Sequence, residues 1–206
     1  ASGGTDSEGR LVKVGSHDPL EDARFLETEI TMWLMQILKR DWPKLARTAE
    51  SEAGDLHAML EERLSGLAIK RAHIFEAVRK AGLNADKPTA WSEDDLVRFL
   101  DMLRRVAKPM LIAGNKIDLE PSEQNIERLK TLNYMVVPCC AEAELALRRA
   151  AEKGWTDYKP GDCNFNVLKP EGLTDVQKMA LQTIKEKILL KFGTTGVQDA
   201  INMAYF

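Results

Sequence analysis

Two short apolar runs, residues 109–114 (PMLIAG) and 134–138 (YMVVP), constrain the fold more than any other feature of this sequence. Each has the length and composition of a buried strand. A helical pattern lies between them at residues 122–132, and another follows at residues 141–154. Strand, helix, strand and helix at this spacing predict two parallel strands joined by a right-handed crossover. We therefore expect an α/β fold in this part of the chain.

The preceding residues, 18–107, are patterned as helices. The first helix is expected to begin at Pro19, because Asp18 can cap it and proline suits the first helical position. Another should begin at Ser92, where Asp95 completes a capping box. Further helical patterns cover residues 42–66, 68–82 and 174–192, and a closing helix should follow Gly196. The expected organisation is a loop over residues 1–17, a helical domain over 18–107 and an α/β domain over 108–206.

Composition argues against several classes of protein. The chain has 29 basic and 32 acidic side chains and a net charge of -3, which gives no electrostatic reason to expect binding to nucleic acid or to an anionic membrane. Cys139, Cys140 and Cys163 lack metal-ligand spacing, so reduced thiols in a cytoplasmic protein are expected. The histidines are scattered, and we expect no catalytic or metal-binding set. No apolar stretch approaches the roughly 20 residues that span a bilayer.

A polar tetrapeptide, Asn115-Lys116-Ile117-Asp118, follows the first apolar run directly. In open α/β sheets, ligands bind beyond the carboxyl ends of the strands. A carboxylate at Asp118 could accept hydrogen bonds from N1–H and the 2-amino group of guanine, whereas adenine offers an acceptor at N1 and has no 2-amino group. The amide of Asn115 could tie neighbouring loops together, and the stem of Lys116 could lie along the purine face. The pattern predicts guanine recognition.

A second loop strengthens this interpretation. The next predicted strand ends at Cys140-Ala141-Glu142, which could present a backbone N–H to the guanine O6. The alternative is a structural role, in which Asp118 caps the following helix and Asn115 forms a turn.

Several longer strings resemble the YchF/Obg-like GTPases, in particular the archaeal and eukaryotic branch that retains NKxD. They are HDPLEDARFLETEI, KPMLIAGNKIDL, VVPCCAEAELALRRAAEKG, DYKPGD and GTTGVQDAIN. The resemblance covers the whole chain and implies a P-loop GTPase domain with a helical insertion, a GTP or GDP ligand and a ribosomal or rRNA partner. It assigns guanine binding to Asn115, Lys116 and Asp118 and to Cys140, Ala141 and Glu142. Cys140 stands where the family usually has serine.

The phosphate-binding loop of that family, GxxxxGK[ST], does not occur in these residues. We therefore expect the chain to begin just past the phosphate machinery and to stop before the family's small C-terminal TGS-type domain. By itself it should bind guanine nucleotides weakly and hydrolyse nothing, with Mg²⁺ needed only by the complete protein. The rival interpretation is a stand-alone helical interaction module in which the α/β part is scaffold.

Overall fold

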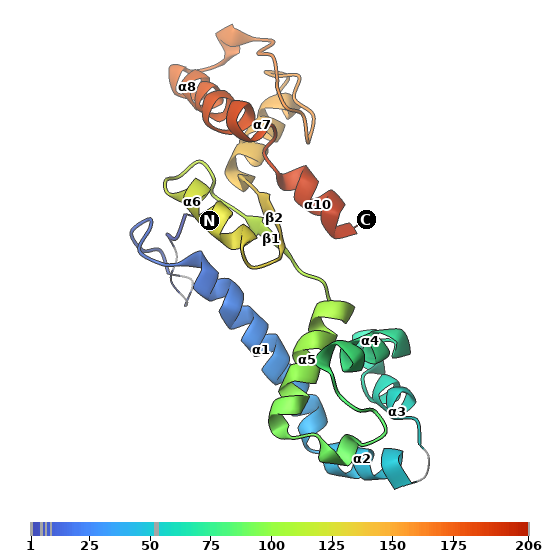
Figure 1. Ribbon diagram of the computed structural model, residues 1–206. Helices are drawn as coiled ribbons and strands as arrows, with labels where there is room; N and C mark the ends of the chain where they lie inside the picture. The colour runs from blue at the N-terminus through green and yellow to red at the C-terminus, as the bar shows by residue number, and fades with distance from the viewer. Residues whose placement is uncertain (1, 5, 7, 9, 52–53, 206) are drawn as a thin grey trace. The chain divides into compact units, whose positions relative to one another are not determined.

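The computed structural model describes residues 2–4, 6, 8, 10–51 and 54–205 (Figure 1). Residues 1, 5, 7 and 9 of the predicted N-terminal loop lie outside the described residues. The fold is mixed α/β and mostly helical, with a small sheet of two parallel strands in the described part of the chain. The elements are α1 (Pro19–Lys39), α2 (Trp42–Ser51), α3 (Leu56–Arg63), α4 (Arg71–Ala81), α5 (Glu93–Ala107), β1 (Leu111–Gly114), α6 (Ser122–Lys130), β2 (Met135–Pro138), α7 (Ala141–Glu152), α8 (Asp175–Ile184), α9 (Leu190–Phe192) and α10 (Val197–Tyr205).

The chain divides into two compact units. One comprises residues 1–22 together with 111–206, and the other comprises residues 23–110. The first contains the sheet and is called the sheet unit below, and the second is called the helical unit. The boundary falls within α1, after Asp22.

The helical unit is built on the apolar faces of its helices. Its core includes Ile74 from α4 and Phe99 and Leu100 from α5, all inaccessible to solvent. The capping box predicted at the start of α5 is confirmed, because the Ser92 hydroxyl accepts a hydrogen bond from the Asp95 N–H at 3.1 Å and the Asp95 carboxylate accepts one from the Ser92 N–H at 2.9 Å. These local contacts give α5 a defined start and register.

The helical pattern over residues 42–66 does not form one helix. It forms α2 and α3, and the Asp55 carboxylate caps α3 by accepting from His57 N–H at 3.0 Å and Ala58 N–H at 3.1 Å. Aspartate at this position satisfies the free N–H groups of a new helix start, and Gly54 before it favours a break. The expectation of a continuous helical segment is therefore wrong here.

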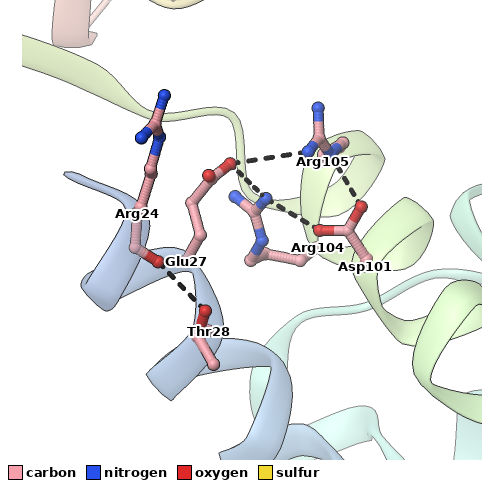
Figure 2. Close-up of polar contacts among 6 residues, drawn as sticks. All are labelled: Arg24, Glu27, Thr28, Asp101, Arg104 and Arg105. Atoms are coloured by element: carbon pink, nitrogen blue, oxygen red, sulfur yellow. Dashed lines mark hydrogen bonds and ion pairs between the residues drawn. The ribbon is translucent and has the colours of Figure 1, made fainter. Parts of the chain in front are cut away.

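A charged cluster connects α1 to α5 within the helical unit (Figure 2). The Arg104 side chain is only 1% exposed, and its guanidinium donates to Glu27 Oε1 at 2.9 Å and to Asp101 Oδ1 at 3.0 Å. Arg105 is half exposed and contacts the same two carboxylates. Because Glu27 lies on α1 and the other three residues lie on α5, the cluster ties the two helices together.

The sheet unit has the predicted parallel strand pair. Leu111 is in register with Met135 and Gly114 with Pro138, which confirms the parallel pairing. The connection runs through α6, which packs along β2, while α10 packs along β1. The buried core of this unit includes Ile126 from α6, Leu147 from α7 and Ile188 from the π-helical turn before α9.

The long helix predicted over residues 174–192 begins as expected, with the Thr174 hydroxyl accepting from Gln177 N–H at 3.3 Å. It does not continue as one α-helix, because a π-helical turn at Lys185–Leu189 separates α8 from α9. The extra residue of a π turn shifts the helix face, and Ile188 and Leu189 are buried there.

Candidate functional site

The two polar loops predicted from the sequence leave the sheet at the same edge. Asn115–Asp118 follow the end of β1, and Cys139–Cys140 follow the end of β2. Beyond the strands, Cys139 N–H donates to the Gly114 carbonyl at 3.0 Å and Ile117 N–H donates to the Cys139 carbonyl at 3.2 Å. The main chains of the two loops therefore remain hydrogen-bonded past the end of the sheet.

Asn115 links these loops through its side chain. Its Oδ1 accepts hydrogen bonds from the Ala141 N–H at 3.0 Å and from the Lys116 N–H at 2.9 Å. Since Ala141 is the first residue of α7, the amide joins the loop after β1 to the start of the helix after β2.

Asp118 lies half buried next to Cys140. The Cys140 thiol donates to Asp118 Oδ1 at 3.3 Å. Burial raises the pKa of the Cys140 thiol to about 11, and the Asp118 carboxylate acts in the same direction. The thiol is therefore neutral at physiological pH and acts as a donor that orients the carboxylate.

The structural alternative for Asp118 is wrong. The residue that precedes α6 as its N-cap is Pro121, and no side-chain capping bond is made there. The Ser122 hydroxyl instead donates to the Ile117 carbonyl at 2.9 Å. Asp118 is consequently not used to start the following helix.

Lys116 has an unusual backbone conformation. Its φ is +67°, in the left-handed region that residues with a Cβ rarely adopt. Such a conformation costs about 1–2 kcal/mol for a lysine, and strained residues of this kind cluster at functional sites. Ala68 and Asn133 also have positive φ, at +54° and +58°, so this conformation alone does not mark a functional loop.

The amides of the second loop are not equivalent. Cys140 N–H donates to the Thr195 carbonyl at 2.8 Å, and Ala141 N–H donates to Asn115. Glu142 lies in the first turn of α7, where backbone N–H groups have no intrahelical acceptor. At the start of α7, the Glu142 amide is therefore the donor most directly available to a ligand. A ligand that bonds the Ala141 amide must compete with the side chain of Asn115.

Thr195 was not among the candidate site residues drawn from the sequence. It is fully buried and belongs to the segment Gly193–Gly196, which precedes α10. The two glycines that flank Thr194-Thr195 are the one local signal of a constrained loop. The contact with Cys140, 55 residues earlier in the chain, has no local signal.

Groups of three or more His, Cys, Asp or Glu able to hold a metal ion are absent from the described residues. Within the same residues, no helix combines the length and apolar character required to cross a membrane.

Comparisons with known proteins find a family model and relatives that include these loops. Residues 113–206 match a GTPase family model. Its description is "Obg-like GTPase YGR210-like, G4 motif-containing domain". The start of the match, residue 113, lies at the end of β1, so the G4 motif-containing domain includes both loops of the candidate site.

Relatives over the whole chain are named as GTP-binding proteins. The chain is 42% identical over 208 residues to an uncharacterized GTP-binding protein of Methanocaldococcus jannaschii and 28% identical over 214 residues to one of Schizosaccharomyces pombe. The two matches include 100% and 98% of this chain, respectively, and 51% of the length of each relative. The chain thus spans about half the length of the curated relatives it matches.

A solved structure shows the same similarity. The crystal structure of a GTP binding protein from Pyrococcus horikoshii OT3 superposes with a TM-score of 0.77 at 40% identity, over 98% of this chain and 54% of that one. Together with the G4 motif-containing domain, these relatives give no support to a stand-alone helical interaction module.

Proposed function

We propose that this chain carries the guanine-recognition part of a GTPase of the YchF/Obg-like class. The observation that carries the proposal is the hydrogen bond from Ala141 N–H to Asn115 Oδ1, which joins the loops after β1 and β2 at one edge of the sheet. Around this bond lie a half-buried carboxylate at Asp118 and the first-turn amides of α7. This combination of acceptor and donors is complementary to the Watson–Crick edge and O6 of guanine.

Each residue has a distinct role in the proposed site. Asp118 accepts from N1–H and the 2-amino group, and the stem of Lys116 covers one face of the purine. The Glu142 amide donates to O6, the Ala141 amide is held by Asn115, and Asn115 and Cys140 keep the two loops in place. Selectivity follows because adenine would leave the carboxylate without donors, at a cost of about 1–3 kcal/mol or more.

GTP hydrolysis is assigned to a longer protein in this proposal. GTP hydrolysis requires phosphate-binding groups and Mg²⁺, and the GxxxxGK[ST] loop that provides them in P-loop GTPases does not occur in residues 1–206. A cytoplasmic location and a ribosomal or rRNA partner are proposed from the family resemblance. The branch that retains NKxD is proposed from Asn115-Lys116-Ile117-Asp118.

Base selectivity tests the proposal in the chain itself. A fluorescent guanine nucleotide bound to the 206-residue chain should be displaced by guanosine at concentrations at least about tenfold lower than by adenosine, because only guanine satisfies the carboxylate. Competition titrations with the two nucleosides measure this ratio. Equal displacement by guanosine and adenosine would contradict guanine recognition.

The strained conformation of Lys116 gives a second prediction. Lys116→Gly should stabilise the chain by about 1 kcal/mol relative to Lys116→Ala, because glycine adopts the left-handed region without a steric penalty. Both variants should bind the guanine nucleotide more weakly than the parent chain, because both lose the stem that covers the purine.

Urea unfolding measures the first difference, and nucleotide titration measures the second. Lys116→Ala serves as the matched control, since it lacks the stem but keeps the strained backbone. If the two variants have the same stability, φ at this position is not a source of strain. If both bind as tightly as the parent, Lys116 does not cover the base.

A further inference from the structure

A buried polar cluster lies behind the second loop. Glu144, on α7, is 4% exposed, and its Oε2 accepts hydrogen bonds from the Thr195 hydroxyl at 2.5 Å and from the Tyr158 hydroxyl at 2.6 Å. Its Oε1 accepts from Arg148 Nε at 2.6 Å. A carboxylate this deeply buried is costly unless its oxygens are satisfied, and here both oxygens have partners.

The protonation state of Glu144 follows from these contacts. Burial by itself raises the pKa of the carboxyl group, but the hydrogen bonds from Thr195, Tyr158 and Arg148 outweigh it and leave the pKa below the ordinary glutamate value. Burial, assisted by Glu144, raises the pKa of Tyr158 to about 12. At neutral pH the cluster therefore consists of an ionised acceptor and two hydroxyl donors, and charge-assisted hydrogen bonds of this type are the strong ones.

Thr195 connects this cluster to the candidate base site. Its hydroxyl donates to Glu144, while its carbonyl accepts the hydrogen bond from the Cys140 N–H at 2.8 Å. The Cys140 carbonyl in turn accepts from the Glu144 N–H at 3.1 Å. The two main-chain polar groups of Cys140 are therefore bonded to main-chain groups of Thr195 and Glu144, the second through the first hydrogen bond of α7.

The segment around Thr195 has little freedom to move. Gly196 has a φ of +74°, and a Cβ at this position would lie 1.8 Å from the Pro138 carbonyl oxygen. The Gly196 N–H donates to the Thr194 hydroxyl at 2.9 Å, and the Cys139 thiol donates to the Gly196 carbonyl at 3.3 Å. Because of these close contacts, a shift of Thr195 would displace the main chain at residues 138–140.

We propose that Glu144 is a positioning residue for guanine recognition, acting through Thr195 on the Cys140 peptide and so on the amides at the start of α7 and on the thiol that orients Asp118. This inference rests on the proposed function. Glu144 does not contact the base in this arrangement. Glu144 instead positions the groups that contact the base, through its hydrogen bond to Thr195 and the bond of Thr195 to Cys140.

Tyr158 provides a matched control. Thr195→Val and Tyr158→Phe each remove one hydroxyl that donates to the same Glu144 oxygen, but only Thr195 bonds the Cys140 amide. Both variants should unfold at a lower temperature than the parent chain. Only Thr195→Val should increase hydrogen exchange at the Cys140 amide and lower the preference for guanosine over adenosine, each by about three- to tenfold.

Conservative variants extend the test. Thr195→Ser keeps the hydroxyl and should restore both the slow exchange of the Cys140 amide and the guanosine preference. Glu144→Met keeps about the size of the side chain but offers Thr195 no oxygen acceptor, so it should behave like Thr195→Val and replaces that variant if valine prevents folding. Amide exchange is followed by NMR on the complete 206-residue chain, and base preference is measured by displacement of a fluorescent guanine nucleotide.

The possible outcomes separate the two proposals. Equal exchange at Cys140 in Thr195→Val and Tyr158→Phe would overturn the link through Thr195. Faster exchange with an unchanged base preference would overturn the positioning role while leaving guanine recognition intact. No base preference in the parent chain would overturn the proposed function itself, a result that the exchange measurements cannot produce.

Discussion

Asp118→Asn should transfer the base preference of this chain from guanine to xanthine. The asparagine side chain presents one acceptor and one donor where aspartate presents two acceptors. Its Nδ2 would then face the 2-amino group of guanine, donor against donor, whereas it can donate to the carbonyl oxygen that xanthine carries at the same position. The ratio of xanthosine to guanosine affinity should rise by at least about 100-fold, because sites built on hydrogen bonds reject a mismatched partner strongly.

Competition between the two nucleosides for the site measures this ratio. Asp118→Ala should lose the preference for guanosine without gaining one for xanthosine, since it offers neither acceptor nor donor. Glu120→Gln is the matched control for charge: it neutralises an exposed acid in the same loop and should leave the preference for guanosine unchanged. An unaltered ratio in Asp118→Asn would show that Asp118 does not read the base.

Arg104→Ala should destabilise the helical unit by about 3–5 kcal/mol. The side chain is buried between α1 and α5, so its removal leaves a cavity and takes the guanidinium away from Glu27 and Asp101. Both carboxylates are partly shielded from water, with 20% and 27% of their side chains exposed, and the half-exposed Arg105 would be a weaker counter-charge for them.

Arg105→Ala is the matched control for this prediction. Arg105 contacts the same two carboxylates, but its side chain is 48% exposed. Exposed ion pairs contribute at most about 1 kcal/mol, so its loss should be small. Urea unfolding followed by tryptophan fluorescence measures both variants, because Trp42 and Trp91 stack in the core of the helical unit with ring centroids 5.2 Å apart. Equal losses of stability in the two variants would mean that burial does not distinguish these arginines.

Some of this architecture could be predicted from the sequence, because the responsible interactions are local. The Ser92 and Asp95 side chains bond backbone groups three residues away, so the start of α5 follows from two residue types at fixed spacing. The parallel strand pair follows from two apolar runs with a helix between them. The same order of elements predicted that the loops at Asn115 and Cys140 would meet at one edge of the sheet.

Other features could not be predicted in this way, even within helices. Arg104 occupies a helical position that an arginine normally keeps in water, and its burial depends on Glu27, 77 residues earlier in the chain. The break between α2 and α3 depended on Asp55 acting as a cap, although the apolar pattern around it continues with helical spacing. The burial of Arg104 was decided by which groups found partners after folding, whereas the Asp55 cap is a local signal that the continuing apolar pattern concealed.

The sequence by itself determined which residues are proposed to read a guanine base, because the required acceptors and donors are properties of Asn115, Lys116, Asp118 and a helix start after a strand. Only the tertiary structure decided how that set is held. It placed the Cys140 thiol against Asp118 and Thr195 between Glu144 and the Cys140 amide. Glu144 and Thr195 are 51 residues apart, and no local pattern specifies such a pair, since the contact forms only when α7 and the segment before α10 pack together.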